Sequence, residues 1–408
     1  MKILQINKYF YKKGGADIVF LNTIRLLEQH GHTVIPFSIE NERNESTTYS
    51  NYFVDYSELS ESGIFTKMRN IFSFIYNRRA AKLLEQLILT EKPDIAHIHL
   101  MFNSLSVSIL PVLKKYNIPI VMSLHDHRLI CPAYLFIDGK GNICEKCLKD
   151  GHYWHCITNR CSKGNFFNSL MLAIDSYFRK YFISPLKFVD KFIFVGEFAQ
   201  KKHISFNPVF EQKSTVLHNF TTLKNENSSS KDDYILYFGR VSEEKGISVL
   251  IEAMKNMPDV KLKIIGTGAL LEELSSCSYT NIEFIGYKTG EELYNYVQKT
   301  LFVIVPSTCY ENNPMAVIES FALGTPVIAS NIGGVPELIQ DCKTGYLVEP
   351  NSPEKLKDAI KKGLNLPSKE YAEMCRETRI FAGANFTEDA YYPKLIAIYN
   401  DAIQNNIK

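Results

Sequence analysis

Residues 301–319 read Leu-Phe-Val-Ile-Val-Pro-Ser-Thr-Cys-Tyr-Glu-Asn-Asn-Pro-Met-Ala-Val-Ile-Glu. The apolar, β-branched run 301–305 predicts a buried parallel strand that ends at the following proline. Asn313 suits an N-cap and Pro314 the first helical position, so we expect a helix that ends at Gly324. This order of strand, loop and helix is typical of a parallel α/β fold, and it places a loop beside a helix N-terminus that attracts anions.

Two carboxylates lie in this stretch, eight residues apart. Glu311 falls in the expected loop and Glu319 on the expected helix. Carboxylates bind hydroxyl groups, and the helix N-terminus beside them binds phosphate. The stretch is therefore suited to bind a sugar nucleotide.

The length and composition of the chain limit its class. With 408 residues, the chain is longer than the roughly 250–300 residues at which single cores stop growing, so we expect two domains. A hydrophobic content of 45% and a charged content of 22% are ordinary for a globular protein and exclude a fibrous or disordered chain. No apolar run reaches the ~20 residues that span a bilayer, and residues 1–7 resemble a strand and not a signal peptide. We expect a cytoplasmic protein.

The first half begins with a β-loop-α-β unit. We expect a strand at 2–6, a helix at 16–30 and a strand at 33–38, with Gly14 and Gly15 in the loop between the first two. Paired glycines allow a ligand close to the backbone at a helix N-terminus, although an ordinary turn uses the same pair. The glycine fingerprint of dinucleotide binding is absent, which disfavours NAD.

Titratable residues follow a later strand of this half. Further strands are expected at 94–99, 119–124 and 191–195, and His125, Asp126 and His127 come directly after the second of these. Ligands of open α/β sheets bind at the carboxyl ends of strands, so we predict that at least one of the three is functional. The alternative is a surface loop.

An insertion at about 128–168 interrupts the α/β pattern. It contains five cysteines, namely Cys131, Cys144, Cys147, Cys156 and Cys161. The spacing of Cys144 and Cys147 is that of a zinc knuckle, and the other three cysteines, with His152 and His155, offer enough further ligands for a four-coordinate structural zinc site. Unpaired thiols in a loop are the alternative interpretation.

Basic and aromatic residues alternate in two stretches, 67–82 and 179–202. The first contains Lys67, Arg69, Phe72, Phe74, Tyr76, Arg78, Arg79 and Lys82. This mixture favours contact with an anionic membrane surface. A solvated helix face over ordinary core aromatics explains it equally well.

The second half repeats the α/β alternation after a polar stretch at 219–233, which we expect to link the domains. Its strands are predicted at 234–238, 262–265, 282–285, 301–305, 327–329 and 346–348. Arg240 and Lys245 lie in its first strand-to-helix loop, where they can neutralise a diphosphate. Taken alone, they would be solvated loop charges.

These motifs resemble those of glycosyltransferase family 4, whose members are retaining enzymes with the GT-B fold. The matching residues are Phe238-Gly-Arg240, Lys245-Gly246, Gly266-Thr-Gly268, Glu311–Glu319, Gly324-Thr-Pro-Val-Ile-Ala-Ser330 and Gly333-Gly-Val-Pro-Glu337. The resemblance is dense in 234–349 and looser in the first half.

The resemblance implies an α/β protein of two Rossmann-like domains that face each other across a deep cleft. Residues 1–218 would bind the acceptor and 219–385 the donor, while 386–408 would form a helix that packs back on the first domain. It also implies site residues. Glu311 and His125 would be catalytic, and the donor would be bound by Arg240, Lys245, Glu319, Gly14, Gly15, Asn313, Met315 and Ala316.

Asn313-Pro314 departs from the aromatic-glycine pair that is frequent in the family. Pro314 has no N–H, so Met315 and Ala316 must supply the backbone donors. The implied activity is a retaining hexosyl transfer, which requires no metal, from a nucleotide-diphosphate sugar, expected to be a UDP-sugar, to a lipid-linked saccharide. Capsule, exopolysaccharide or O-antigen synthesis at the inner face of the membrane is the implied context, without nucleic acid.

Two other functions remain open from the residues. A nucleotide-sugar epimerase could use the same architecture. A nucleotide-sugar-binding subunit of a transferase complex is the non-enzymatic alternative, although both Glu311 and Glu319 are present.

Overall fold

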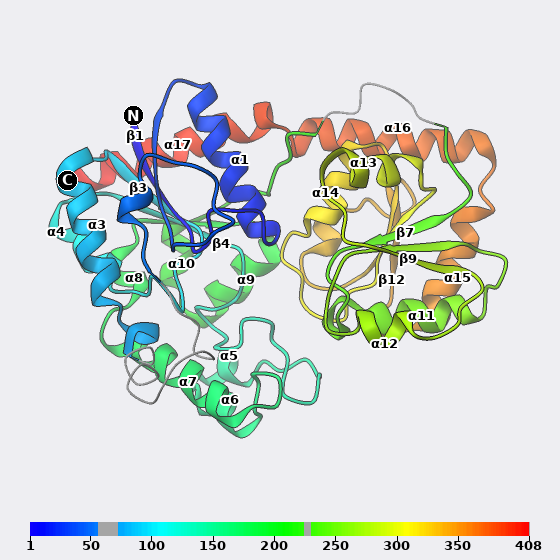
Figure 1. The fold of residues 1–408 in the computed structure, drawn as a ribbon, viewed down its shortest axis with the longest axis horizontal. Helices are drawn as coiled ribbons and strands as arrows, with labels where there is room; N and C mark the ends of the chain where they lie inside the picture. Colours follow the sequence, from blue (N-terminus) through cyan, green and yellow to red (C-terminus); the bar gives the residue numbers. More distant parts are fainter. Residues whose placement is uncertain (56–71, 224–229, 408) are drawn as a thin grey trace. The chain divides into compact units, whose positions relative to one another are not determined.

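The computed structural model describes residues 1–55, 72–223 and 230–407 (Figure 1). The chain forms two compact domains, of which one comprises Met1–Leu217 with Tyr392–Lys408 and the other His218–Tyr391. The backbone thus passes from one domain to the other at Leu217 and again inside the last helix. Lys67 and Arg69 of the basic stretch, and residues 224–229 of the expected linker, lie outside the described residues.

The described part of the first domain contains a six-stranded parallel sheet in the order β2-β1-β3-β4-β5-β6. Its strands are β1 Lys2–Ile6, β2 Thr33–Phe37, β3 Ile95–Ile98, β4 Ile120–Leu124, β5 Lys191–Phe194 and β6 Ser214–Val216. All residues of β3 and β4 are buried, as expected for a parallel sheet covered on both faces. The five predicted strands are confirmed, and β6 was missed because its three residues are too few for a pattern.

The helices of the first domain follow the strands in turn. They are α1 Gly15–Gln29, η1 Ser50–Tyr52, α3 Arg78–Glu91, α4 Ile109–Lys115, α5 Lys146–Asp150, α6 Trp154–Thr158, α7 Phe166–Tyr181, α8 Pro185–Phe188, α9 Glu197–Phe206 and α10 Val209–Lys213. The short helices α5 and α6 belong to the cysteine-containing insertion, and α6 packs on α7.

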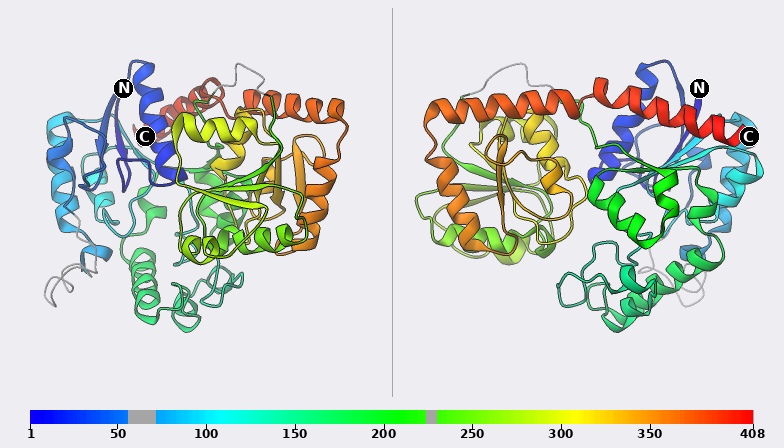
Figure 2. Two further views of the ribbon diagram at one scale, coloured as in Figure 1. Left: turned by 45° about the vertical axis from the view of Figure 1, so that its right-hand side comes forward. Right: turned by 180° about the vertical axis from the view of Figure 1, so that it is seen from behind.

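The last helix, α17 Glu388–Ile407, starts in the second domain and continues along the first. The view from behind in Figure 2 shows this helix, in red, against the first domain. Tyr399 is fully buried there, and its hydroxyl lies 2.7 Å from Nδ1 of His97. Asp401 forms an ion pair with Lys191 at 2.5 Å.

The second domain contains another six-stranded parallel sheet, in the order β12-β11-β10-β7-β8-β9 among its described residues. The strands are β7 Ile235–Phe238, β8 Leu262–Ile265, β9 Ile282–Gly286, β10 Val303–Val305, β11 Val327–Ser330 and β12 Gly345–Val348. The helices are η2 Glu243–Lys245, α11 Ile247–Lys255, α12 Leu271–Ser275, α13 Gly290–Lys299, α14 Met315–Ala322, η3 Val335–Glu337, α15 Pro353–Leu364 and α16 Ser368–Asn385. Figure 1 shows α13 and α14 on one side of this sheet and α11, α12 and α15 on the other.

Residues 301–319 fold with two differences from the prediction. The strand starts at Val303 and not at Leu301, and the helix starts at Met315. Pro314 is the N-cap, with an extended backbone, so the prediction that Asn313 caps the helix is wrong. The side chain of Asn313 bonds elsewhere, as described below.

The polar stretch after the first domain is only partly a linker. Asn219, Phe220 and Thr221 are buried in the second domain. Phe220 stacks on Tyr391 at 4.2 Å between ring centroids, and the Thr221 N–H donates to the Phe386 carbonyl at 2.9 Å.

In each sheet the order of the strands reverses direction at one place. The loops that follow the two strands at that place lie next to each other. In the first sheet the chain moves from β1 to β2 on one side and returns to β3 on the other. In the second sheet β7 and β10 are the corresponding neighbours. Ligands of open α/β sheets bind at the carboxyl ends of such strand pairs.

Candidate active site

The loops that follow β7 and β10 meet in the second domain. Gly246, which follows Lys245, has φ of +72°, and a Cβ at this position would lie 1.8 Å from the carbonyl oxygen of Pro306. The Thr308 N–H donates to the Glu244 carbonyl at 3.1 Å. Only glycine permits both the left-handed backbone and this close approach, so the Lys245-Gly246 motif joins the two loops.

Lys245 and Glu311 form an ion pair across these loops. The distance from Nζ to Oε1 is 2.5 Å, and the side chains are only 26% and 12% exposed. The Ser307 hydroxyl donates to the same carboxylate oxygen at 2.8 Å. The structure therefore brings together the residue predicted for the diphosphate and the residue predicted for the sugar.

The charges of this pair decide its protonation. Burial acts to raise the pKa of Glu311, but the charge of Lys245 and the bonds from Lys245 and Ser307 outweigh it, so the pKa is lowered. Burial acts to lower the pKa of Lys245, and the Glu311 carboxylate outweighs it, so that pKa is raised. Both groups are charged at neutral pH.

Arg240 lies at the carboxyl end of β7, beside the pair. Its guanidinium is 57% exposed and lies 3.3 Å from a carboxylate oxygen of Glu244. The Tyr237 hydroxyl donates to the Arg240 carbonyl at 2.5 Å, which holds the backbone of this loop. The charge of Arg240 also helps to lower the pKa of Glu311. An exposed guanidinium next to a buried ammonium is suited to bind an anion with more than one charge.

Helix α14 supplies backbone donors and the second carboxylate. The N–H groups of Met315 and Ala316 start the helix, and no acceptor for them is found among the described residues. Glu319 is buried on the next turn. Burial, followed by the charge of Glu319, raises the pKa of Tyr294 on α13, which places the Glu319 carboxylate near that helix.

Gly333 and Gly334 hold the loop that carries Glu311. The Gly334 N–H donates to the Glu311 carbonyl at 2.7 Å. A Cβ on Gly334 would lie 2.0 Å from the carbonyl oxygen of Asn312, and one on Gly333 would lie 2.4 Å from that of Glu311. The glycines therefore act through close backbone packing around the carboxylate.

Asn313 uses its side chain inside the domain. Its Oδ1 accepts the Asn219 N–H at 2.9 Å, and its Nδ2 lies 3.2 Å from Nδ1 of His218. The Asn219 side chain donates to the Asn313 carbonyl at 3.1 Å. The loop that carries Glu311 is thus tied to the first residues of the domain, and a donor contact by Asn313 stays a prediction.

In the first domain, Gly14 is the N-cap of α1 and Gly15 its first residue, and both are exposed. Gly14 has an extended backbone, and a Cβ there would meet only Asp17 at 3.8 Å. Neither strain nor packing requires glycine at this cap. The missing side chain leaves the helix N-terminus open, which fits the predicted ligand contact.

Asp17 lies in the first turn of this helix. It is buried, its carboxylate bonds the Gly14 N–H, and the Asn7 amide donates to Oδ1 at 2.8 Å. Burial raises the pKa of Asp17 to about 6, against the opposing effect of these bonds and of Lys13 and Lys8.

His125 follows β4 directly and is half-buried. Its Nε2 lies 3.0 Å from Nδ1 of His99, the residue that follows β3. Burial lowers the pKa of His125 to about 4, so the imidazole is neutral at pH 7. Of its neighbours, His127 is buried and lies beside His203, with 5.9 Å between ring centroids.

The five cysteines of the insertion are free thiols. Cys147 and Cys156 pack with Tyr153 and Ala173 in an apolar cluster, and Cys156 donates to the Ser169 carbonyl at 3.7 Å. Burial raises the pKa of Cys131 to about 12 and also raises that of Cys147. Within the described residues no group of three or more His, Cys, Asp or Glu side chains could hold a metal ion. The structure does not support the zinc prediction.

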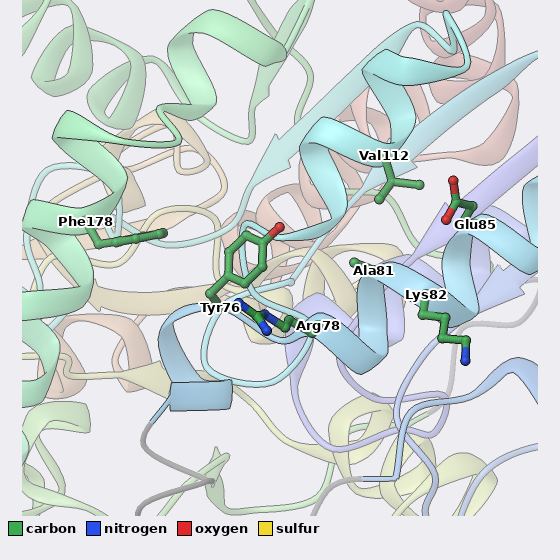
Figure 3. A pocket seen from close by; sticks show the side chains of 7 residues that line it. All are labelled: Tyr76, Arg78, Ala81, Lys82, Glu85, Val112 and Phe178. Atoms are coloured by element: carbon green, nitrogen blue, oxygen red, sulfur yellow. The ribbon is translucent and has the colours of Figure 1, made fainter.

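The described part of the basic-aromatic stretch lines an open pocket of about 670 Å³. Figure 3 shows the Phe178 side chain pointing toward Tyr76, with Arg78 beside Tyr76, and the centroids of the two aromatic rings lie 6.2 Å apart. Phe182 is 74% exposed and stacks on Phe178 at 5.2 Å between ring centroids. No helix in the described chain is long and apolar enough to cross a membrane.

The predicted site residues fall in two groups. Of the predicted catalytic and donor-binding residues, Gly14, Gly15 and His125 lie in the first domain and the others in the second. Sequence reasoning missed Ser307 and His99. The signal for His99 was present, because His97 and His99 alternate at the end of a predicted strand and therefore share a face.

Known proteins share this fold and these motifs. Residues 13–224 match the family model described as Glycosyltransferase Family 4, and residues 219–380 match that of Glycosyl transferases group 1. The chain therefore belongs to glycosyltransferase family 4, and it is a glycosyltransferase.

Three relatives illustrate the similarity. An uncharacterised glycosyltransferase of Methanocaldococcus jannaschii is 24% identical over 369 residues, which cover 90% of this chain and 89% of that protein. An uncharacterised 42.6 kDa protein in the cps region of Klebsiella pneumoniae is 25% identical, with coverages of 86% and 90%. The O-antigen biosynthesis glycosyltransferase WbnH of Escherichia coli is 28% identical over 251 residues, with coverages of 60% and 67%.

Solved structures establish the fold as GT-B. Anabaena HepE in complex with UDP has a TM-score of 0.63 at 16% identity and covers 98% of this chain and 100% of HepE. Sucrose-phosphate synthase from Thermosynechococcus elongatus has a TM-score of 0.72 at 18% identity, with coverages of 99% and 100%. The predicted fold class is confirmed.

Proposed function

We propose that this protein transfers a hexose, with retention, from a UDP-sugar to a lipid-linked saccharide in the assembly of a surface polysaccharide. The observation that carries the proposal is the contact between Lys245 and Glu311 at the carboxyl ends of β7 and β10. A partly buried ammonium and a partly buried carboxylate then lie side by side, as an anionic leaving group and the sugar bound to it require.

The chemistry follows from charge. Cleavage of the bond between the sugar and the diphosphate leaves the bonding electrons on the phosphate oxygen, and Lys245, Arg240 and the α14 N–H groups stabilise that charge. The acceptor hydroxyl attacks the sugar from the same face and gives its proton to the departing phosphate. Glu311 contacts sugar hydroxyls near the reacting carbon, and Glu319 binds the ribose. These side-chain charges stabilise the leaving group, which is the role of a metal ion in other transferases.

UDP is proposed because HepE has been solved in complex with UDP. Polysaccharide assembly is proposed because one relative lies in a cps region and another acts in O-antigen biosynthesis. The pocket lined by Arg78, Tyr76 and Phe178, next to the exposed Phe182, fits an anionic amphiphile. We therefore infer a cytoplasmic protein that contacts the inner face of the membrane.

The donor is tested by thermal shift with UDP, GDP, ADP and their hexose conjugates, in EDTA. A ligand at 100 times its Kd adds about 2.7 kcal/mol to the stability of the folded state. We expect UDP and one UDP-hexose to raise the melting temperature and the other bases to leave it unchanged. No response to any nucleotide, from a protein that melts cooperatively, would contradict the donor site.

The role of Glu311 is tested with Glu311→Gln, which keeps the size of the side chain and removes its charge. We expect UDP binding to persist while kcat falls on the order of 100-fold, because the contact acts on the reacting sugar. Glu370→Gln, on the exposed side of α16, is the matched control. Conversion of the UDP-hexose to an epimer without any acceptor would favour the epimerase alternative. Binding without turnover in the wild-type protein, with every acceptor offered, would favour the binding subunit.

A further inference from the structure

His99 is a buried imidazole next to the candidate catalytic histidine. It is 1% exposed, and its ring lies 4.2 Å from that of His97 and 5.4 Å from that of Phe20, measured between centroids. Its Nδ1 lies 3.0 Å from Nε2 of His125, and the two ring planes differ by 13°. This geometry is that of an N–H···N hydrogen bond between two imidazoles.

His97 cannot replace His125 as the partner of His99, because both of its nitrogens are in use. Its Nδ1 lies 2.7 Å from the Tyr399 hydroxyl, and its Nε2 lies 2.8 Å from the Ser123 hydroxyl. The Gln5 amide donates to the Tyr399 oxygen at 3.1 Å, so the Tyr399 hydroxyl can donate to His97. His97 then carries its proton on Nε2 and donates to Ser123.

The bond between His99 and His125 requires one N–H and one lone pair. Burial lowers the pKa of both rings, to about 4 for His125 and well below the usual range for His99, so each carries a single proton at pH 7. Nε2 of His99 is buried and has no hydrogen-bond partner among the described residues. A proton on that nitrogen would be a buried, unpaired N–H group, which is costlier than an unpaired acceptor. The proton of His99 therefore belongs on Nδ1.

We propose that His99 is a positioning residue that donates from Nδ1 to Nε2 of His125 and so holds His125 in its Nδ1–H tautomer. His125 is then a hydrogen-bond donor at Nδ1, and its Nε2 lone pair is unable to accept a proton from the acceptor hydroxyl. The tautomer follows from the first domain alone, and only the contact of His125 with the sugar rests on the proposed function. The result agrees with proton transfer to the departing phosphate.

The tautomer is tested by NMR of the full-length protein labelled with ¹⁵N in its histidine rings. The signals of His125 are assigned by their absence in His125→Gln, and the nitrogen that carries the proton is read from the ring ¹⁵N shifts. We expect Nδ1–H in the wild-type protein. A proton on Nε2 of His125 would overturn the proposal, whatever the activity.

Two variants of nearly equal size separate positioning from packing. In His99→Asn the side-chain amide nitrogen takes the place of Nδ1 and keeps the donor, whereas His99→Leu removes it. We expect the Asn variant to retain the Nδ1–H tautomer of His125 and the Leu variant to lose it. His203→Leu removes another buried imidazole, which bonds the Ala199 carbonyl at 2.7 Å, and it should leave the His125 signals unchanged.

Kinetics supply the second readout. We expect His99→Leu to lower kcat about 10-fold with little change in KM for the donor, and His99→Asn to restore most of it. If kcat falls equally in both variants, in proportion to the fall in their melting temperatures, the role of His99 is structural and the positioning role is rejected. Nδ1–H on His125 in a protein that turns over no nucleotide sugar would uphold the tautomer and refute the proposed function, so the two failures are distinguishable.

Discussion

At the scale of residues, burial and charge determine which side chains are able to take part in chemistry. Lys245 and Glu311 keep their charges because each is the other's counterion, whereas burial lowers the pKa of His97, His99 and His125 and leaves the three imidazoles neutral. Burial alone therefore favours the neutral imidazole. The same effect explains Asp17, which has amide partners and forms no ion pair within the part of the chain that the structure describes.

Asp17 makes the stability of the first domain depend on pH. Its pKa is about 6 in the folded protein and lower in the unfolded chain, so between about pH 4 and pH 6 the folded state holds a proton that the unfolded state has lost. Stability therefore falls as pH rises through this window, by about 3 kcal/mol in total. Asp17→Asn removes the effect, so its stability should equal that of the wild type near pH 4 and exceed it above pH 6.

Urea unfolding of both proteins at pH 4.5 to 7.5 measures this difference. Asp259→Asn, on an exposed turn, serves as the control and should show no such trend. A difference between wild type and Asp17→Asn that does not change with pH would show that the carboxyl is not protonated on folding.

At the scale of elements, the site depends on loops that approach each other closely after β7, β10 and β11. Glycine permits three of these approaches, at Gly246, Gly333 and Gly334. The carboxylate of Glu311 is thus held by the packing of backbones around it. The position of a glycine in a motif is visible in the sequence, but the carbonyl that it meets belongs to another element.

Gly246→Ala should separate the loops that carry Lys245 and Glu311. The added Cβ would lie 1.8 Å from the Pro306 oxygen at a φ of +72°, so we expect a loss of more than about 2 kcal/mol in stability. UDP binding should weaken with it. The matched variant is Gly383→Ala in α16, where a Cβ meets nothing within 4 Å and the helix should gain up to about 1 kcal/mol. Equal stability of the two variants would contradict the proposed contact.

At the scale of the whole molecule, the second domain carries most of the residues proposed to bind the donor, and the first carries the surface proposed to meet the membrane. The exposed apolar side chains of the first domain include Phe72, Phe167, Tyr181 and Phe182. Arg78 and Lys82 line the pocket together with Phe178, on which Phe182 stacks, and Lys180 lies over the Tyr181 ring at 5.5 Å. Apolar and basic groups on one surface favour an anionic bilayer.

Vesicle sedimentation tests this surface. We expect binding to vesicles that contain phosphatidylglycerol and none to vesicles of phosphatidylcholine alone. Arg78→Gln with Lys82→Gln removes two charges, worth about 1 kcal/mol each, and should weaken binding about 30-fold. Lys355→Gln with Lys361→Gln on α15 of the second domain removes the same charge and should have little effect. Equal binding to both kinds of vesicle, or equal effects of both pairs, would reject the assignment.

The sequence by itself determined the two α/β domains, eleven of the twelve described strands and the motifs of the donor domain. It could do so because these features depend on local pattern, such as β-branched runs, glycines and charges near strand ends. Motifs in the sequence also predict the site residues Arg240, Lys245, Glu311, Glu319 and His125, whose roles stay predictions.

Only the tertiary structure decided which partners these residues have. Lys245 and Glu311 are 66 residues apart in sequence. They meet because the strand order puts β7 beside β10. Asn313 bonds His218 and Asn219 and does not cap a helix. Of the cysteines whose spacing suggested zinc, Cys147 and Cys156 pack in an apolar cluster. A hydrogen bond or a metal site depends on distances between elements, and the packing of the folded chain sets these distances.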